Sequence, residues 1–208
     1  MCLGGSGRPA EQSWGCCMIR LTDGMLLYHG SYIEVSEIDL SKCRPGLDFG
    51  RGFYVTSSLK QARAYVPSSV KKAQRRGWIS RDFAAEQGVI SVFEYHASPA
   101  LFVHCFEEAD AEWLHFAVCN RSERLFPELR RKYRTVDIIG GCVADDQTAI
   151  TLNSYVAGIF GTPGDPSTDR RAIELLEPER LQDQFCFRTD DAVHSLQFVR
   201  SINYGDSE

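Results

Sequence analysis

Short apolar runs, separated by turn-forming residues, set the pattern of this chain. Residues 25–29 form an apolar run that ends in Gly30-Ser31, and they predict a first strand. Residues 89–95 are rich in β-branched and aromatic side chains and predict the clearest strand. Further strands are predicted over 49–55, 101–106, 135–143 and 184–188. The pattern therefore indicates several short strands rather than a few long elements.

Helical patterns fill much of the sequence between these strands. A serine N-cap precedes the helix predicted over 58–65, and a polar helix over 70–87 is broken at Gly77. Residues 110–119 place Trp113 on an apolar stripe, which predicts a helix packed on the core. Shorter helices are predicted over 149–160 and 170–176, a loop over 161–169, and a helix or strand over 192–198. Short strands and helices without regular alternation predict an α+β fold.

A single domain over residues 25–204 is expected to contain all these elements. The chain has 208 residues, of which 43% are hydrophobic, so a sizeable core is possible. Residues 1–24 lack the apolar segment of a secretory signal peptide and are interpreted as a flexible leader. Such a leader is compatible with a specialised injection system or with an ordinary tail. No apolar run reaches the roughly 20 residues that span a bilayer, so no membrane span is expected.

The charge balance argues against nucleic acid as a partner. The formal net charge is −5, whereas a general nucleic-acid-binding surface is basic. Two local clusters are basic nevertheless, and both are interpreted as solvated helix faces. They consist of Lys71, Lys72, Arg75 and Arg76 in one case and Arg130, Arg131, Lys132 and Arg134 in the other.

The eight cysteines show no metal-binding pattern. No Cys-x-x-Cys pair is present, and His115 and Cys119, four residues apart, do not make a site on their own. Most of the later cysteines lie among apolar neighbours and are interpreted as small buried hydrophobes. This usage fits a protein that acts in a reducing compartment, and no metal is expected.

Three segments carry the candidate chemistry. They are Tyr28-His29-Gly30-Ser31, Asp48-Phe49-Gly50-Arg51-Gly52-Phe53-Tyr54-Val55-Thr56, and Leu181-Gln182-Asp183-Gln184-Phe185-Cys186-Phe187. Each segment alone has a structural explanation, because a strand-end histidine commonly belongs to the core and Gly50-x-Gly52 lacks the spacing of a dinucleotide fold. Their order along the chain is the informative feature.

In this order the segments resemble the nicotinamide-binding strands of ADP-ribosyltransferases of the diphtheria-toxin and poly(ADP-ribose)-polymerase type. The chain is also similar to a bacterial family of uncharacterised proteins with the pattern YHGS, DFGxGFY, VADD and QF.F. The resemblance covers about residues 25–200 and departs from the transferases at Gln184, where they carry a glutamate. It implies an ADP-ribosyltransferase-like split β-sandwich with flanking helices, in which small antiparallel sheets hold NAD between them.

The resemblance implies NAD as co-substrate and gives each motif a role. Gly30 and Ser31 would hold the carboxamide, His29 the adenosine-side ribose and Gln184 the nicotinamide ribose. Tyr54 would stack on the nicotinamide ring, worth about 1 kcal/mol beyond area burial. The full set expected to line the NAD site is His29, Gly30, Ser31, Gly52, Phe53, Tyr54, Tyr65 and Gln184.

Cleavage of the nicotinamide–ribose bond develops a cation that a carboxylate normally stabilises. Gln184 carries no charge, so another acid is expected to assist. Asp146 is the preferred candidate, with its neighbour Asp145, and Glu94 is a weaker one. By resemblance, the absence of the glutamate disfavours polymer elongation and favours mono-transfer.

The function implied by the resemblance is mono-ADP-ribosylation of a protein side chain. A serine or threonine hydroxyl is a suitable acceptor, and host ubiquitin is one candidate protein. The chain would then be a bacterial effector or toxin secreted into the host cytosol, or otherwise a cytoplasmic protein. An NAD glycohydrolase and a non-catalytic NAD or ADP-ribose binding module are the open alternatives. Residues 67–88 have no counterpart in the minimal fold, and we hypothesise that they dock the target.

Overall fold

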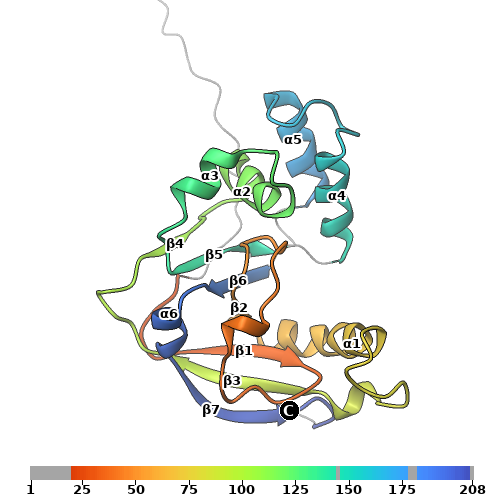
Figure 1. Ribbon diagram of the computed structural model, residues 1–208, viewed down its shortest axis with the longest axis vertical. Helices are drawn as coiled ribbons and strands as arrows, with labels where there is room; N and C mark the ends of the chain where they lie inside the picture. The colour runs from red at the N-terminus through yellow and green to blue at the C-terminus, as the bar shows by residue number, and fades with distance from the viewer. Residues whose placement is uncertain (1–19, 144–145, 178–181, 207–208) are drawn as a thin grey trace, which may run out of the picture.

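The computed structural model describes residues 20–143, 146–177 and 182–206 and has an α+β fold, as predicted. Its strands form two sheets (Figure 1). The first sheet, in the order β1-β3-β7, contains β1 (Met25–Ser31), β3 (Val89–Tyr95) and β7 (Leu196–Asn203). The second sheet, in the order β2-β6-β5-β4, contains β2 (Phe53–Val55), β6 (Gln182–Phe187), β5 (Ile138–Val143) and β4 (Val103–Cys105).

The two sheets enclose a shared hydrophobic core. Leu27 and Phe93 of the first sheet belong to one cluster with Phe53, Phe185 and Phe187 of the second. All five side chains are buried. Because successive side chains of a strand point to opposite faces, these residues define the inner face of each sheet.

The strand pairs of both sheets are antiparallel, except that β4 runs parallel to β5. The expectation of purely antiparallel sheets is therefore wrong at this edge. The connection between these strands contains α2 (Ala111–Arg121) and α3 (Pro127–Lys132), of which α3 was not predicted. A crossover of this length returns the chain to the end of the sheet from which it started, as parallel pairing requires.

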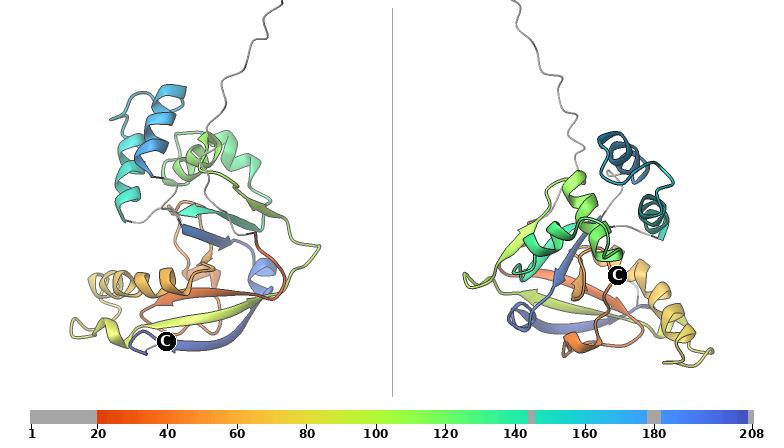
Figure 2. Two further views of the ribbon diagram at one scale, coloured as in Figure 1. Left: turned by 180° about the vertical axis from the view of Figure 1, so that it is seen from behind. Right: turned by 45° about the horizontal axis from the view of Figure 1, so that its top comes forward.

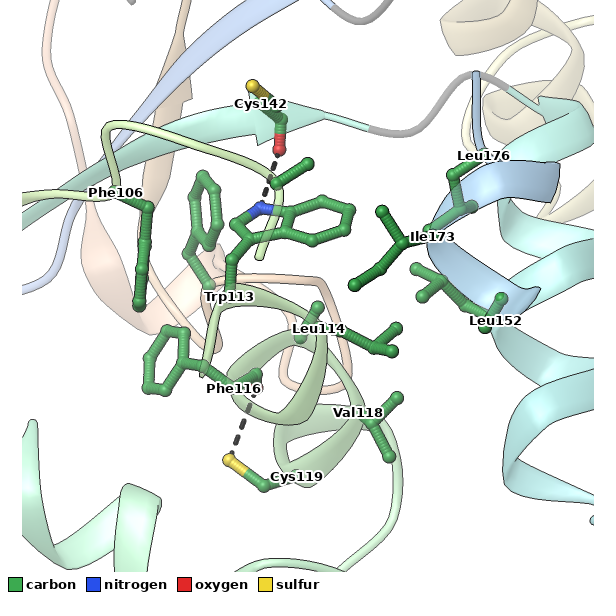
Figure 3. Close-up of a cluster of buried hydrophobic side chains, with 14 of the residues drawn as sticks. Phe106, Trp113, Leu114, Phe116, Val118, Cys119, Cys142, Leu152, Ile173 and Leu176 are labelled. Carbon is green, nitrogen blue, oxygen red and sulfur yellow. Dashed lines mark hydrogen bonds between the residues drawn. The ribbon is translucent and has the colours of Figure 1, made fainter. Parts of the chain in front are cut away.

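A second core lies on the outer face of the second sheet. Trp113 of α2 is fully buried there, and its Nε1 donates to the carbonyl of Cys142 at 3.0 Å (Figure 3). Leu152 and Ile173 pack into the same cluster from two further helices. These helices are α4 (Asp146–Val156) and α5 (Pro166–Leu175). Because α2 is covered from several directions, it is buried around much of its circumference and not only along the single apolar stripe that was predicted.

One helix, α1 (Leu59–Arg75), covers the outer face of the first sheet. The expected pair of helices is therefore wrong, since α1 continues through Pro67. Burial of one face against β1 and β3 outweighs the local cost of proline. The helix ends at a Schellman motif, in which Gly77 has φ +71° and Trp78 N–H donates to the carbonyl of Ala73. The buried residues of α1 are Ala62, Val66, Val70 and Ala73.

Short elements complete the described chain. They are η1 (Leu40–Lys42), η2 (Ala85–Gln87) and α6 (Asp190–His194). Residues 1–19 of the predicted leader lie outside the described residues, but Leu21 packs against the core between the sheets, so the folded domain begins before Met25. Among the helices described, none has the length and apolar character needed to cross a bilayer.

Candidate functional site

The two sheets meet where the edge strands β1 and β2 pair at one position. The amide of Tyr28 donates to the carbonyl of Thr56 at 2.8 Å, and the amide of Thr56 donates back at 3.0 Å. Because peptide groups alternate in direction along a strand, the N–H and C=O of Gly30 point the same way as those of Tyr28, away from β3. At Gly30, β1 therefore presents a main-chain donor and acceptor that match a carboxamide.

Gly30 is also the point of closest approach between β1 and α1. A Cβ built on Gly30 would lie 2.0 Å from the carbonyl oxygen of Ala62. The helix thus occupies the side-chain face of this residue, and a ligand can reach Gly30 only along the edge of the strand. Glycine is required here by helix–strand packing, which the sequence interpretation did not anticipate.

Replacement of Gly30 by alanine is expected to destabilise the protein by on the order of 3 kcal/mol, because β1 and α1 must separate to admit the methyl group. Urea unfolding measures the loss. Gly205→Ala is the matched control, since the nearest atom to its new Cβ lies 3.8 Å away, an ordinary contact. Equal stabilities of the two variants would contradict the packing argument.

His29 is fixed on the inner face of β1. Its Nδ1 lies 2.8 Å from the carbonyl oxygen of Tyr54, and its ring packs on Phe53 with centroids 4.6 Å apart. Burial lowers the pKa of His29, and the hydrogen bond to Tyr54 opposes part of this shift. The neutral ring then donates through Nδ1, which leaves Nε2 as an acceptor for a ligand hydroxyl.

Tyr54 does not have the geometry of a stacking platform. Its hydroxyl donates to the carbonyl of Gly50 at 2.6 Å and accepts from the amide of Phe49 at 3.1 Å. Its ring packs against the second core, and burial raises the pKa of Tyr54 well above its ordinary value. Tyr54 therefore closes the glycine-rich loop before β2, and the predicted stacking role is corrected.

Gly52 and Phe53 also serve packing. A Cβ on Gly52 would lie 2.5 Å from the Cys186 sulfur and 2.6 Å from the carbonyl oxygen of Phe187, so glycine lets β2 approach β6. Phe53 is buried between the sheets beside His29. Neither residue presents a polar side chain to a ligand, contrary to the expectation that both line the NAD site directly.

Ser31 and Tyr65 occupy different surroundings. Ser31 is buried, and its Oγ lies 3.5 Å from the amide of Ile33. Tyr65 is 46% exposed on α1, and Lys72 Nζ lies 4.7 Å from the centre of its ring. Since Tyr54 belongs to the second core and Tyr65 to the surface of α1, the two rings do not line one common site, contrary to the expectation.

An ion pair anchors the loop that carries the second motif. Asp48 accepts from Arg121 Nε at 2.7 Å, and both side chains are largely buried. Asn120 Nδ2 donates to the carbonyl of Asp48 at 2.9 Å. Gly50 follows with φ +85°, the left-handed region that favours glycine. These contacts tie the entry to β2 to the end of α2.

A carboxylate lies where β6 meets the end of β2. Asp183 Oδ1 accepts from the hydroxyl of Thr56 at 2.7 Å and from the amide of Ser57 at 3.1 Å. Its Oδ2 accepts from the hydroxyl of Ser57. A carboxylate offers about four lone-pair sites, so one remains for a ligand. Since Thr56 is also the main-chain partner of Tyr28, Asp183 is held near the free edge of β1.

The hydrogen-bond roles around Thr56 are fixed by its single hydroxyl hydrogen. Its Oγ1 accepts from the amide of Ser58 at 3.1 Å, and it lies 2.7 Å from Asp183 Oδ1 and 2.5 Å from the side-chain amide of Gln61. Because Thr56 has one hydrogen to donate, it donates to Asp183 Oδ1, and the third contact is satisfied when the Gln61 amide is turned so that its NH2 group, in place of Oε1, faces Thr56. Thr56 therefore connects α1 to β6.

The side chain of Gln184 lies on the opposite face of β6 from that of Asp183. Phe185 and Phe187 of β6 pack between the sheets, whereas Cys186 belongs to the core on the outer face. The alternation of the strand places Asp183 on the inner side with the phenylalanines, and Gln184 on the outer side with Cys186. Gln184, which was predicted to bind the ribose, therefore faces away from the position where β1 and β2 meet, and Asp183, which the sequence interpretation missed, is the residue of β6 that lies there.

A family model covers most of the chain. The family described as "Protein of unknown function (DUF3990)" matches residues 25–198. The chain belongs to this family. No curated protein and no solved structure matches it. The matched residues include His29, Gly30, Thr56 and Asp183, so the polar site is contained within the DUF3990 domain.

The other acids predicted to assist are remote or not described. Asp145 and the side chain of Asp146 lie outside the described residues, although the main chain of Asp146 begins α4. Glu94 pairs with Leu26 on β3, whereas Ile90 pairs with Gly30. Four residues of strand, about 13 Å, therefore separate Glu94 from the pair at Gly30. In this DUF3990 domain, Asp183 contacts the junction directly, through the hydroxyl of Thr56.

The stability of the domain is expected to depend on the ionisation of His29. Because the folded pKa of His29 is lowered, the unfolded chain takes up a proton as the pH falls below about 6.5 while the folded chain does not. The free energy of unfolding should therefore fall with acidification. Urea titrations of wild type and His29→Gln at about pH 5 and about pH 8 measure the slope. His104, whose pKa burial also lowers, is common to both proteins. An unchanged slope in the variant would contradict the assignment.

Proposed function

We propose that this protein is a mono-ADP-ribosyltransferase that moves ADP-ribose from NAD to a protein side chain. The bond between nicotinamide and ribose C1 breaks, and its electron pair leaves with nicotinamide. The acceptor oxygen forms the new bond to C1 and loses its proton. NAD supplies the activated ribose, and the protein supplies orientation and charge.

The juxtaposition of Gly30 and Asp183 across the Tyr28–Thr56 pair carries the proposal. The main-chain N–H and C=O of Gly30 suit the carboxamide of nicotinamide, because a primary amide needs one acceptor and one donor. Asp183 offers a negative charge and a remaining lone pair to the ribose. Glycosyl transfer requires both features on adjacent elements, since the positive charge develops on the ribose directly attached to nicotinamide.

His29 and Ser57 support this arrangement. Neutral His29 presents Nε2 as a hydrogen-bond acceptor, which suits a ribose hydroxyl. Ser57 binds both carboxylate oxygens of Asp183, through its amide and its hydroxyl, and so fixes the orientation of the acid. A carboxylate held in this way acts on a developing cation without reorganisation.

Incubation of the purified protein with labelled NAD in a eukaryotic cell lysate tests the proposal, with purified ubiquitin as a separate acceptor. Label on a discrete protein, together with free nicotinamide, is the expected result, and both signals should be lost in His29→Ala. Nicotinamide without labelled protein would replace the proposal by NAD hydrolysis. Binding of NAD with neither labelled protein nor free nicotinamide would instead indicate a non-catalytic binding module.

A further inference from the structure

A cluster of cations occupies the C-terminal half of α1 and the loop that follows it. Its members are Lys71, Lys72, Arg75, Arg76 and Arg81, called here the α1 basic surface. In the described part of the chain, none of these five is among the ion pairs within 4.0 Å. Like charges three or four residues apart on a helix are destabilising, so the cluster has a local cost without a partner.

The second basic segment of the sequence behaves differently. Arg130 lies 3.7 Å from Glu123, and Lys132 is paired with Glu112. Arg130 also donates to the carbonyl of Cys119. Two of the four cations of this segment, Arg130 and Lys132, are therefore paired within the protein. The α1 basic surface is the exception.

The loop after α1 is hydrogen-bonded to the helix, which keeps Arg81 of the loop close to the cations of the helix. Gln74 Nε2 donates to the carbonyl of Arg81 at 2.9 Å and to the carbonyl of Phe83 at 3.0 Å. A pocket of about 330 Å³ lies between this loop and the helix, lined by Lys71, Gln74, Arg75 and Arg81. Gln74 thus ties the main chain of the loop to the helix, and three cations line one concavity, where carboxylate groups can bind.

Exposed aromatic side chains flank the cations. Trp78 is 58% exposed, and the guanidinium of Arg76 lies 4.7 Å from its ring centre. Tyr65 is 46% exposed with Lys72 over its ring. Tyrosine, tryptophan and arginine are the residues that contribute most to protein–protein interfaces. Figure 2 shows the loop after α1 at the margin of the molecule in both views.

We propose that the α1 basic surface docks an acidic segment of the protein that receives ADP-ribose, which rests on the function proposed above. The same helix carries Gln61 at its first turn, beside Asp183, and Arg75 at its end. Fourteen residues of helix separate the two by about 21 Å. A partner that engages both ends of α1 must therefore be a macromolecule.

Charge complementarity selects the class of partner. The chain as a whole has a formal net charge of −5, so the α1 basic surface is a local exception that favours a compact acidic patch. Three of the five cations of this surface, Lys71, Arg75 and Arg81, line a single pocket. A groove for single-stranded nucleic acid needs cations that follow several successive nucleotides, and this surface does not have that extent.

Binding is tested without NAD by titrating the full chain with poly-L-glutamate and following the emission of Trp78. Trp78→Phe identifies the signal of this residue. Wild type should bind, and Arg75→Glu/Arg81→Glu should bind on the order of tenfold more weakly. Arg170→Glu/Arg171→Glu makes the same change of net charge on exposed positions of α5 and should bind like wild type. A single-stranded oligonucleotide of equal charge is the competing probe.

Transfer is then tested with labelled NAD. Arg75→Glu/Arg81→Glu should release nicotinamide at the wild-type rate and lose labelling of protein by about tenfold or more. Equal labelling by this variant, or tighter binding of the oligonucleotide than of poly-L-glutamate, would overturn the proposal. If neither wild type nor any variant released nicotinamide, the proposed transferase function would be wrong. The titration without NAD would still decide whether the α1 basic surface binds acidic chains.

Discussion

Asp183→Asn is expected to lower the rate of ADP-ribose transfer by about 10²–10³-fold, the typical loss when one electrostatic contact to a transition state is removed. Asparagine keeps the shape of the side chain, and the hydroxyl of Ser57 can turn to accept from its NH2 group. The fold should therefore persist while the negative charge that we propose faces the ribose is lost. Initial rates of nicotinamide release and of label transfer measure the effect.

Gln184→Ala is the matched control on the neighbouring position of β6. Gln184 lies on the outer side of the strand with Cys186, so its removal should change the rate by less than about threefold, within the context dependence of single contacts. A large loss in Gln184→Ala with little loss in Asp183→Asn would reverse the assignment of the two residues. Circular dichroism of both variants separates a loss of activity from a loss of structure.

Arg121→Leu is expected to destabilise the protein by about 3–5 kcal/mol, because it leaves the buried carboxylate of Asp48 without its partner. Burial raises the pKa of Asp48, and Arg121 opposes this shift, so the carboxylate depends on the guanidinium for its charged form. Chemical unfolding measures the change. The variant should also disturb β2, since Asp48 anchors the loop that enters this strand.

The double variant Asp48→Leu/Arg121→Leu tests whether the cost comes from the unpaired charge. Removal of both partners should recover a substantial part of the stability lost in Arg121→Leu, because no buried charge remains. Additive losses would show that Arg121 acts through other contacts, such as its hydrogen bond to Asn153 at 3.3 Å.

The strands were predictable where their side chains alone determine them. Residues 89–95 are β-branched and aromatic, and they form β3 as expected. The short helix α3 was missed because its sequence is polar and Phe126, just before it, adopts φ 50°, which is rare for a bulky residue. The ring of Phe126 stacks on His115 with centroids 3.8 Å apart, so a tertiary contact accompanies this local conformation.

The sequence singled out part of the polar cluster that the structure shows at the junction of the two sheets. His29 and Gly30 follow from the first motif, and both lie at the junction of the two sheets. The assignment of Gln184 relied on alignment to a family pattern. The alternation of side chains along β6 already separates the two residues. Phe185 and Phe187 point inward, and Asp183, two residues before Phe185, is expected on the same face, whereas Gln184 is expected on the opposite face. The roles of Thr56 and Ser57 depend on three-dimensional contacts that no spacing in the sequence reports.

The single Tyr28–Thr56 pair has a consequence for how this site can change during evolution. A full ladder would hold two strands about 4.8 Å apart along its whole length, whereas one residue pair sets the spacing at one point. Beyond it, the separation of β1 from α1 depends on the close approach of Gly30 to the Ala62 carbonyl and on side chains such as Val66. Substitutions at such positions can widen or narrow the binding region without altering either sheet. The shape of the site can therefore change while both sheets keep their strand pairing.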